Sequence, residues 1–210
     1  MTQALLFPAE PALPAGLVYQ PDFLSLAEEN ELLDQLGTLC FVEARYKEWT
    51  ARRRTVGYGA RFDFDTHQLC PAVDIPATFL SLRDRIAAWA GLQAGQFQQM
   101  LINEYAPGTP LGWHRDAPCF EHVVGVSLAG SARMRLRPYP PQTPGRAACV
   151  LELAARSAYQ LRAVARWDWQ HAISPTRTLR YSITFRTLSE SARAYRPPGR
   201  MSPTLAHDPG

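Results

Sequence analysis

The sequence lacks any apolar run of the roughly 18 to 20 residues that a membrane-spanning helix requires. It also lacks, at its first residues, the charged segment and apolar stretch that mark an export signal. These absences exclude a membrane protein with helical spans. We therefore expect a soluble, cytoplasmic protein that has no membrane partner.

Lysine is almost absent, because Lys47 is the one lysine among 22 basic residues. The positive charge is therefore carried by arginine, whose planar fork suits carboxylates and phosphates. The net charge of +3 is small. Charge alone does not establish a nucleic-acid partner.

Cysteine is sparse and widely spaced, with four residues and no CxxC pair. They are Cys40, Cys70, Cys119 and Cys149. This spacing argues against a zinc knuckle, and we expect reduced thiols that lie mostly in the core. A Gly-rich phosphate loop and a DFG motif are also missing, so the "HRD" at His114 does not indicate a kinase.

The length of 210 residues and the hydrophobic content of 46% suit one compact domain. We expect an irregular lead-in over residues 1–13, a single domain over 14–190 and a flexible tail over 191–210. Nothing in the sequence indicates an obligate protein partner, so a monomer is expected.

The pattern of apolar residues predicts helices in the first half and strands in the second. One helix is predicted within 23–37, with Ser25 as its N-cap and Gly37 as its stop, and another within 76–91. Short β-rich runs cover 96–105, 122–130, 132–139, 148–155, 158–164 and 179–188. Runs at this close spacing favour an antiparallel sandwich or barrel braced by helices, a mostly β fold of the α+β type.

The stretch "GWHRDAPCFEH" holds the densest group of metal-ligating residues. In a strand, His114 and Asp116 point to the same face, so both can bind one ion. His171, which precedes the last predicted strand, is the best third ligand, and His122 is a minor alternative. Two imidazoles and one carboxylate form the facial triad typical of non-haem Fe(II), although the same ligands also suit a zinc hydrolase.

The final predicted strand, "RYSITFR", separates polar from apolar residues by parity. Its polar residues are Arg180, Ser182, Thr184 and Arg186, and its apolar or aromatic residues are Tyr181, Ile183 and Phe185. The pattern fits either an amphipathic strand with arginines in water or a polar face that lines a cavity. The two arginine backbones lie about 20 Å apart. Arms of roughly 6 Å each would then leave a gap that suits a five-carbon diacid.

Four motifs in order, "NEYAPG", "HRD", His171 and "RYSITFR", resemble the AlkB family of Fe(II)- and 2-oxoglutarate-dependent dioxygenases over residues 14–188. The resemblance implies a double-stranded β-helix, or cupin-like jelly roll, over about 97–188. It implies Fe(II), the cosubstrate 2-oxoglutarate and O2, with His114, Asp116 and His171 as metal ligands and catalytic residues.

The same resemblance implies a set of contacts to 2-oxoglutarate. Asn103 and Tyr105 would donate hydrogen bonds to it, Arg180 would pair with its distal carboxylate, and Arg186 would lie near its keto-acid end. Ser182 stands where many members have asparagine, and it keeps a shorter hydrogen-bonding group. The implied reaction couples decarboxylation of 2-oxoglutarate to hydroxylation of an N-alkyl carbon, which leaves as an aldehyde.

Residues 43–64 match the family's substrate lid and mix arginines with aromatic residues. The candidate substrate contacts there are Trp49, Arg52, Arg53, Arg54 and Tyr58. Arginines pair with phosphates and aromatic rings stack on an extruded base, whereas a solvated basic hairpin is the simpler interpretation. Pro118 stands where DNA-repair members often have an acidic residue.

Four functions remain to be compared. The first is oxidative dealkylation of alkylated bases in DNA or RNA, which makes nucleic acid the expected partner. The second is the same oxygenase chemistry on tRNA, a protein or a small molecule. The third is a zinc hydrolase that uses the same three ligands, and the fourth is a nucleic-acid-binding module without catalysis.

Overall fold

The computed structural model describes residues 13–46, 49–63, 65–142 and 148–193. The expected lead-in and most of the expected tail therefore lie outside the described residues. The segment expected as tail begins inside a short helix, α4 (Glu190–Arg193).

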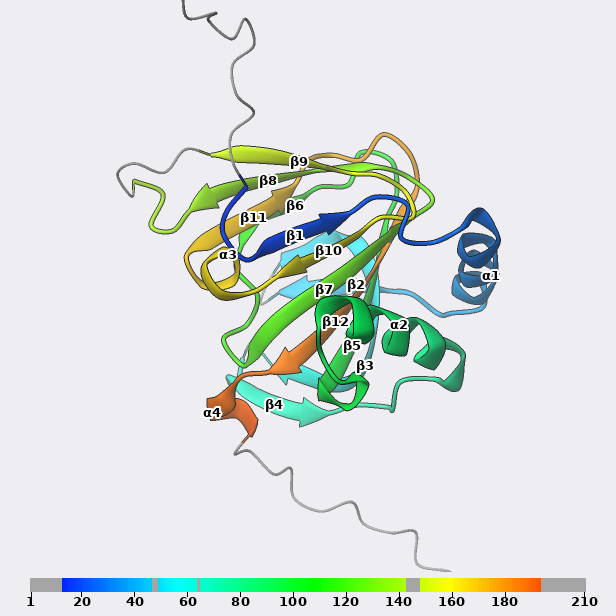
Figure 1. Cartoon of the computed structure of the whole chain (residues 1–210), viewed down its shortest axis with the longest axis horizontal. Coiled ribbons are helices and arrows are strands. Elements are labelled where there is room, and N and C mark those ends of the chain that lie inside the picture. Colours follow the sequence, from blue (N-terminus) through cyan, green and yellow to red (C-terminus); the bar gives the residue numbers. More distant parts are fainter. Residues whose placement is uncertain (1–12, 47–48, 64, 143–147, 194–210) are drawn as a thin grey trace, which may run out of the picture.

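Two antiparallel β-sheets form the body of the molecule (Figure 1). The large sheet has the order β1-β10-β7-β12-β5-β3-β2, with β4 paired to β3. Its strands are β1 (Leu17–Gln20), β2 (Val42–Tyr46), β3 (Trp49–Asp63), β4 (Gln68–Pro71), β5 (Phe97–Tyr105), β7 (Phe120–Leu128), β10 (Ala158–Leu161) and β12 (Arg180–Leu188). The small sheet has the order β6-β11-β8-β9. Its strands are β6 (Leu111–His114), β8 (Ala132–Pro138), β9 (Cys149–Leu153) and β11 (Trp169–Ile173). This is a jelly roll, as the resemblance implies.

All six predicted β runs are confirmed, as β5, β7, β8, β9, β10 and β12. The shorter strands β1, β4, β6 and β11 were not predicted. Each has four or five residues. The predicted lid is also part of the fold rather than a separate flap, because β3 pairs with β5 from Arg54 to Gly59.

The first predicted helix is α1 (Leu26–Gly37), and Ser25 and Glu28 form a reciprocal capping box at its start. Gly37 is the last helical residue, and Thr38 is the C-cap. Leu26, the first residue of the helix, is 62% exposed. Its position in the first turn, one residue after the cap, points it to solvent, while Leu32 and Leu36 face the core.

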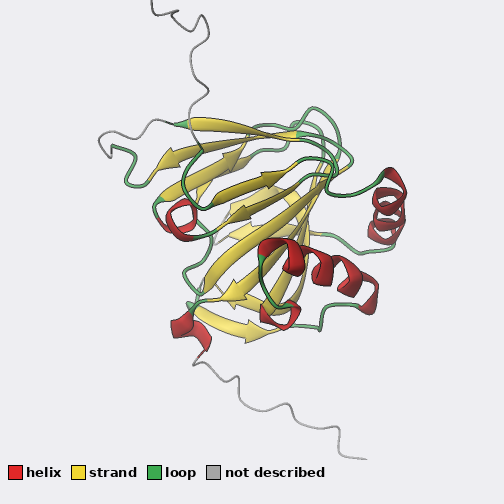
Figure 2. Ribbon diagram, in the orientation of Figure 1, coloured by secondary structure: helices red, strands yellow, loops and turns green. Residues whose placement is uncertain are grey.

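The second predicted helix is divided. A 3-10 turn, η1 (Ala77–Phe79), leads into α2 (Leu80–Ala90). Gly91 ends α2 with φ of +69°, the left-handed conformation that glycine adopts at low cost. Another 3-10 turn, η2 (Ala94–Gln96), leads into β5, and the short helix α3 (Ala163–Trp167) precedes β11. Figure 2 shows α1 and α2 next to the large sheet and away from the small sheet.

Two apolar clusters hold the fold together. One joins α1 and α2 to the large sheet through buried residues such as Leu36, Ile86 and Phe185. The other fills the space beneath the small sheet, with Leu136, Leu153 and Trp169 at its centre. The cysteines were expected mostly in the core, but only Cys149 of the four is buried.

Candidate active site

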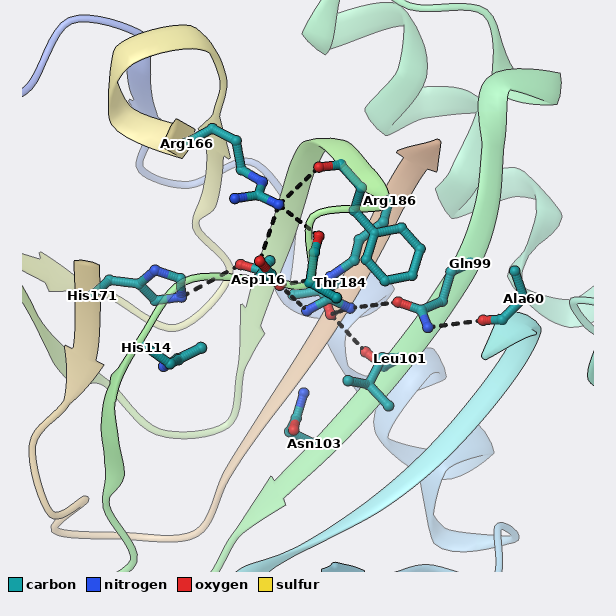
Figure 3. A network of polar contacts seen from close by, with 12 residues as sticks. Ala60, Gln99, Leu101, Asn103, His114, Asp116, Arg166, His171, Thr184 and Arg186 are labelled. Atoms are coloured by element: carbon teal, nitrogen blue, oxygen red, sulfur yellow. Dashed lines mark hydrogen bonds and ion pairs between the residues drawn. The ribbon is translucent and has the colours of Figure 1, made fainter. Parts of the chain in front are cut away.

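The three predicted metal ligands come together between the two sheets. His114 ends β6, His171 lies in β11, and the two are register partners. Asp116 follows β6 by two residues. One ligand atom from each of the three lies within 4.8 Å of the others, and Figure 3 shows the three side chains facing one another. The structure thus brings the three predicted residues within reach of one ion, and their role as metal ligands stays a prediction.

The protonation states of the three side chains suit the binding of a cation. Burial lowers the pKa of His171 to about 3, so its ring is neutral at pH 7. Burial also lowers the pKa of His114, whose Nδ1 lies 2.8 Å from the carbonyl oxygen of Gly112. Burial would raise the pKa of Asp116, but the adjacent positive charge of Arg186 outweighs this effect and holds that pKa well below its ordinary value. The result is two neutral imidazoles and a carboxylate.

Arg186 orients the carboxylate of Asp116. Its Nε donates to Oδ1 of Asp116 at 2.8 Å, and its Nη1 donates to Gln99 at 3.0 Å and to Thr184 at 3.1 Å. The other oxygen of Asp116, Oδ2, is buried and has no hydrogen-bond partner among the described residues. One carboxylate oxygen is therefore fixed by arginine, and the other is left for a metal ion.

The polar face of β12 lines the same pocket, as the parity of "RYSITFR" predicts. The pocket has a volume of about 1200 Å³ and is lined by Arg180, Ser182, Thr184 and Arg186. The pairing of β12 with β5 sets Arg180 opposite Tyr105 and Ser182 opposite Asn103. The side chains of both strands therefore enter the pocket in one layer.

Arg180 is 1% exposed and lies at the end of this layer. Its Nε donates to the hydroxyl of Ser127 at 2.9 Å, and its guanidinium centre lies 5.1 Å from the ring centroid of Tyr105. Its Nη1 is buried and has no hydrogen-bond partner among the described residues. A buried guanidinium with an unsatisfied donor is costly unless an anion binds it.

The predicted lid contacts divide by parity along β3. Arg53 faces the pocket, and its Nε donates to the side-chain oxygen of Asn103 at 3.2 Å. Arg54 lies on the opposite face and pairs with Glu104 at 2.7 Å. Tyr58 packs against the apolar cluster beneath the helices. Arg54 and Tyr58 were expected at the substrate, and the alternation of the strand turns them away from it.

Arg52 and Trp49 are the two remaining candidate substrate contacts of the lid. Arg52 is exposed and shares the parity of Arg54, and the side chain of Trp49 lies outside the described part of the chain. His122, the minor alternative ligand, sits in β7 with its Nδ1 3.5 Å from the amide nitrogen of Gln160. It is not part of the metal cluster.

Known proteins with similar sequences point to the same chemistry. Residues 16–186 match the model of the 2OG-Fe(II) oxygenase superfamily. The chain belongs to this superfamily. It is 30% identical over 180 residues to the alkylated DNA repair protein ALKBH8 homolog of Arabidopsis thaliana, covering 75% of this chain and 50% of that protein. It is 29% identical over 120 residues to the probable RNA/DNA demethylase ALKBH6 of Danio rerio, covering 56% of this chain and 48% of that protein.

A further relative and a solved structure extend the comparison. The chain is 25% identical over 170 residues to the tRNA (carboxymethyluridine(34)-5-O)-methyltransferase alkbh8 of Xenopus tropicalis, covering 79% of this chain and 26% of that protein. It thus spans half or less of the length of each of these relatives. The solved structure of OsALKBH1 has a TM-score of 0.63 at 17% identity, over 86% of this chain and all of that one, and it shares the fold. The oxygenase is thus similar in sequence to AlkB-like proteins and shares the fold of one of them.

The residues fit the groups that this superfamily uses, which are Fe(II), 2-oxoglutarate and O2. The unpaired oxygen of Asp116 and the neutral histidines suit a divalent cation. The unsatisfied Nη1 of Arg180 suits a carboxylate. The pocket therefore offers an anionic end for the metal and a cationic end for a diacid.

The geometry also revises the role expected for Arg186 in this oxygenase. The sequence predicts that a diacid binds between Arg180 and Arg186. The guanidinium of Arg186, however, already donates hydrogen bonds to Asp116, Gln99 and Thr184. Arg186 lines the pocket, but its main contact is to the metal ligand. Its contact with the keto-acid end of 2-oxoglutarate stays a prediction.

Sequence reasoning missed two residues that support the site. Gln99 holds Arg186, and it shares the parity of Asn103 and Tyr105 along β5, so the period of the strand would have revealed it. Arg166 is 2% exposed and donates from Nη2 to the carbonyl oxygens of Asp116 at 3.1 Å, Ala117 at 2.7 Å and Phe120 at 2.8 Å. No local pattern marks Arg166, because its partners lie about fifty positions away.

Replacing Arg166 by methionine is expected to loosen the loop that carries Asp116. Loss of the charged hydrogen bonds should lower the free energy of unfolding by about 3 kcal/mol. Because the loop positions a ligand, the affinity for Mn²⁺ should fall about 10- to 100-fold. Urea unfolding and a metal titration measure the two effects. Arg162→Met, an exposed change beside α3, is the control, and unchanged Mn²⁺ affinity in Arg166→Met would show that the loop does not position Asp116.

Among the described residues, no helix has the length and the apolar character that crossing a membrane requires.

Proposed function

We propose that this oxygenase removes alkyl groups oxidatively from bases in DNA or RNA, as in the repair of alkylated nucleic acid. The carrying observation is the pocket itself, in which the metal triad, the unsatisfied Arg180 and the pocket-facing Arg53 line one cavity of about 1200 Å³. A cavity of this size can hold 2-oxoglutarate and a flipped base together. The names of the relatives, a DNA repair homolog and a probable RNA/DNA demethylase, support the same substrate class.

Each part of the chain has a defined task in this proposal. Fe(II) with 2-oxoglutarate and O2 supplies the oxidising power for hydroxylation of a C–H bond. His114, Asp116 and His171 would hold the metal, and Arg180 would pair with the distal carboxylate of the cosubstrate. Because the oxygen of Asn103 accepts from Arg53, its amide nitrogen is the group left to donate to 2-oxoglutarate. A hydroxylated N-alkyl carbon then leaves as an aldehyde, and the base is restored.

Charged side chains of both signs line the pocket. Pro118, at the position where a carboxylate would face a cationic base, is exposed and uncharged. Arg53 brings a positive charge to the same pocket, and burial lowers its pKa. Glu43, Asp63 and Asp65 line the same pocket, and Arg53 offers a donor to a base with a carbonyl or ring-nitrogen acceptor.

A panel of methylated oligonucleotides tests the proposal. The Fe(II)-loaded enzyme with 2-oxoglutarate and O2 should release formaldehyde from N-methylated bases in DNA or RNA. The panel should include neutral lesions such as N6-methyladenine and cationic lesions such as 1-methyladenine. Formaldehyde release from a methylated protein or metabolite, with none from any oligonucleotide, would overturn the assignment to nucleic acid and favour the second hypothesis. Hydrolysis without succinate formation would instead identify a zinc hydrolase.

A further inference from the structure

The outer face of the small sheet is built differently from that of the large sheet. Helices α1 and α2 cover the large sheet, and Figure 1 shows β6, β11, β8 and β9 at the other side of the molecule. Along β8, Met134 and Leu136 point inward to the buried cluster. Because side chains alternate along a strand, Arg133, Arg135 and Arg137 point outward.

A tryptophan organises two of these arginines. The guanidinium centre of Arg135 lies 5.0 Å from the ring centroid of Trp113, and that of Arg137 lies 4.3 Å from it. The Nε of Arg137 also donates to the side-chain oxygen of Gln170 at 2.9 Å. Cation–π contacts occupy the flat faces of the guanidinium groups. The N–H groups at the edges stay available to an anion.

A second pair extends this row to the mouth of the pocket. Arg115 is exposed and lines the pocket, and its guanidinium centre lies 4.0 Å from the ring centroid of Tyr139. Its Nη1 donates to the carbonyl oxygen of Trp167 at 2.9 Å. Tyr139 directly follows the last residue of β8 and is 42% exposed. The two stacked groups are Trp113 with Arg135 and Arg137, and Tyr139 with Arg115. Together they extend from the rim of the pocket to the outer face of the sheet.

The charge of this face is almost entirely positive. Glu152 is the only acidic residue in the four strands, and it pairs with Arg133 at 2.7 Å. Arg135 and Arg137 therefore have no carboxylate partner within the sheet. We call the surface made by Trp113, Arg115, Arg135, Arg137 and Tyr139 the arginine–aromatic face.

We propose that the arginine–aromatic face binds the phosphodiester backbone of the single strand whose alkylated base enters the pocket. The inference rests on the proposed function. Arginine forks bind phosphate oxygens in pairs, and residues two apart on a strand are separated by about 7 Å, which is close to the distance between successive phosphates. The aromatic rings hold the guanidinium groups against the sheet, so little side-chain entropy is lost on binding.

The experiment is a salt titration of binding to a fluorescent single-stranded oligonucleotide of about 20 nucleotides that carries one methylated base. Each phosphate contact to a single strand contributes about 0.7 to the slope of log K against log salt. The Arg135→Gln, Arg137→Gln double variant should therefore lose about 1.4 of that slope, which corresponds to about 25-fold weaker binding at 0.1 M salt. Its melting temperature should match that of the wild type, because both side chains lie at the surface.

Two further variants separate local charge from net charge and from packing. The Arg83→Gln, Arg85→Gln double variant removes the same charge from α2, where the arginines pair with Asp84 and Glu28, and it should bind like the wild type. The Arg135→Lys, Arg137→Lys variant should keep at least half of the lost slope. Equal losses in both glutamine variants, or a lysine variant as weak as its glutamine counterpart, would overturn the proposal.

The proposed binding surface and the proposed catalytic function can be overturned independently of each other. Wild-type protein that binds the oligonucleotide through Arg135 and Arg137 but releases no formaldehyde would support the arginine–aromatic face and overturn the proposed function. Formaldehyde release with unchanged binding in the glutamine variant would do the reverse. Wild-type protein that binds an acidic peptide, and not the oligonucleotide, would overturn the arginine–aromatic face as a nucleic-acid surface.

Discussion

An Asp116→Ala variant should form no measurable succinate from 2-oxoglutarate in the presence of Fe(II) and O2. Asp116 is the one carboxylate of the metal cluster, and its Oδ2 has no hydrogen-bond partner among the described residues. Loss of a residue that merely supports a ligand costs about 10- to 100-fold in metal affinity or activity, and loss of the ligand itself should cost more. Mass-spectrometric detection of succinate measures the effect.

The same substitution should also weaken the fold. It leaves Arg186 buried without the oxygen that now lies 2.7 Å away. An unpaired buried charge costs about 3 to 5 kcal/mol, so the free energy of unfolding should fall by that amount. Asp84→Ala, which removes an exposed carboxylate on α2, is the matched control and should change neither quantity. Succinate formation at the wild-type rate in Asp116→Ala would rule out the triad as the metal site.

An Arg180→Met variant should lose the binding of 2-oxoglutarate. Arg180 is fully buried beside Tyr105, and its Nη1 is the unsatisfied cationic donor of the pocket. Loss of one partner of a buried charge pair costs 2 to 5 kcal/mol or more, so the Kd for 2-oxoglutarate should rise at least about 30-fold. Calorimetric titration of the Mn²⁺-loaded protein measures this constant without turnover.

Two controls identify the cause of that loss. Arg180→Lys keeps the charge without the fork and should lie between the methionine variant and the wild type. Arg156→Met removes an arginine that pairs with Glu29 away from the pocket, and its affinity for 2-oxoglutarate should not change. A wild-type Kd in Arg180→Met would show that the distal carboxylate binds elsewhere.

The sequence predicted the parts of the site that follow from short-range periodicity. Alternation along residues 180–186 correctly separated the pocket face from the core face. That prediction succeeds because a strand imposes a period of two wherever its neighbours lie. His114 and Asp116 also lie close together, but Asp116 follows the end of β6, so the loop after the strand places it there rather than strand alternation.

Periodicity did not predict which side chains of the lid face the pocket. Residue types in 43–64 indicated a basic, aromatic segment, but they did not indicate which parity faces the pocket. The register of β3 against β5 sets Arg54 opposite Glu104, and their pairing turns Arg54 outward while Arg53 reaches Asn103. A shift of one residue would have exchanged the two arginines.

By itself, the sequence determined the mostly β fold, the three residues that cluster as candidate metal ligands and the polar face that carries Arg180, because each is encoded by a local pattern or an ordered set of motifs. Only the tertiary structure decided that Arg186 holds Asp116, that Arg166 holds the loop beneath it, and that Arg135 and Arg137 flank Trp113. These contacts join residues from separate strands and loops. Their partners are set by sheet register and by the packing of the two sheets, which no local pattern records.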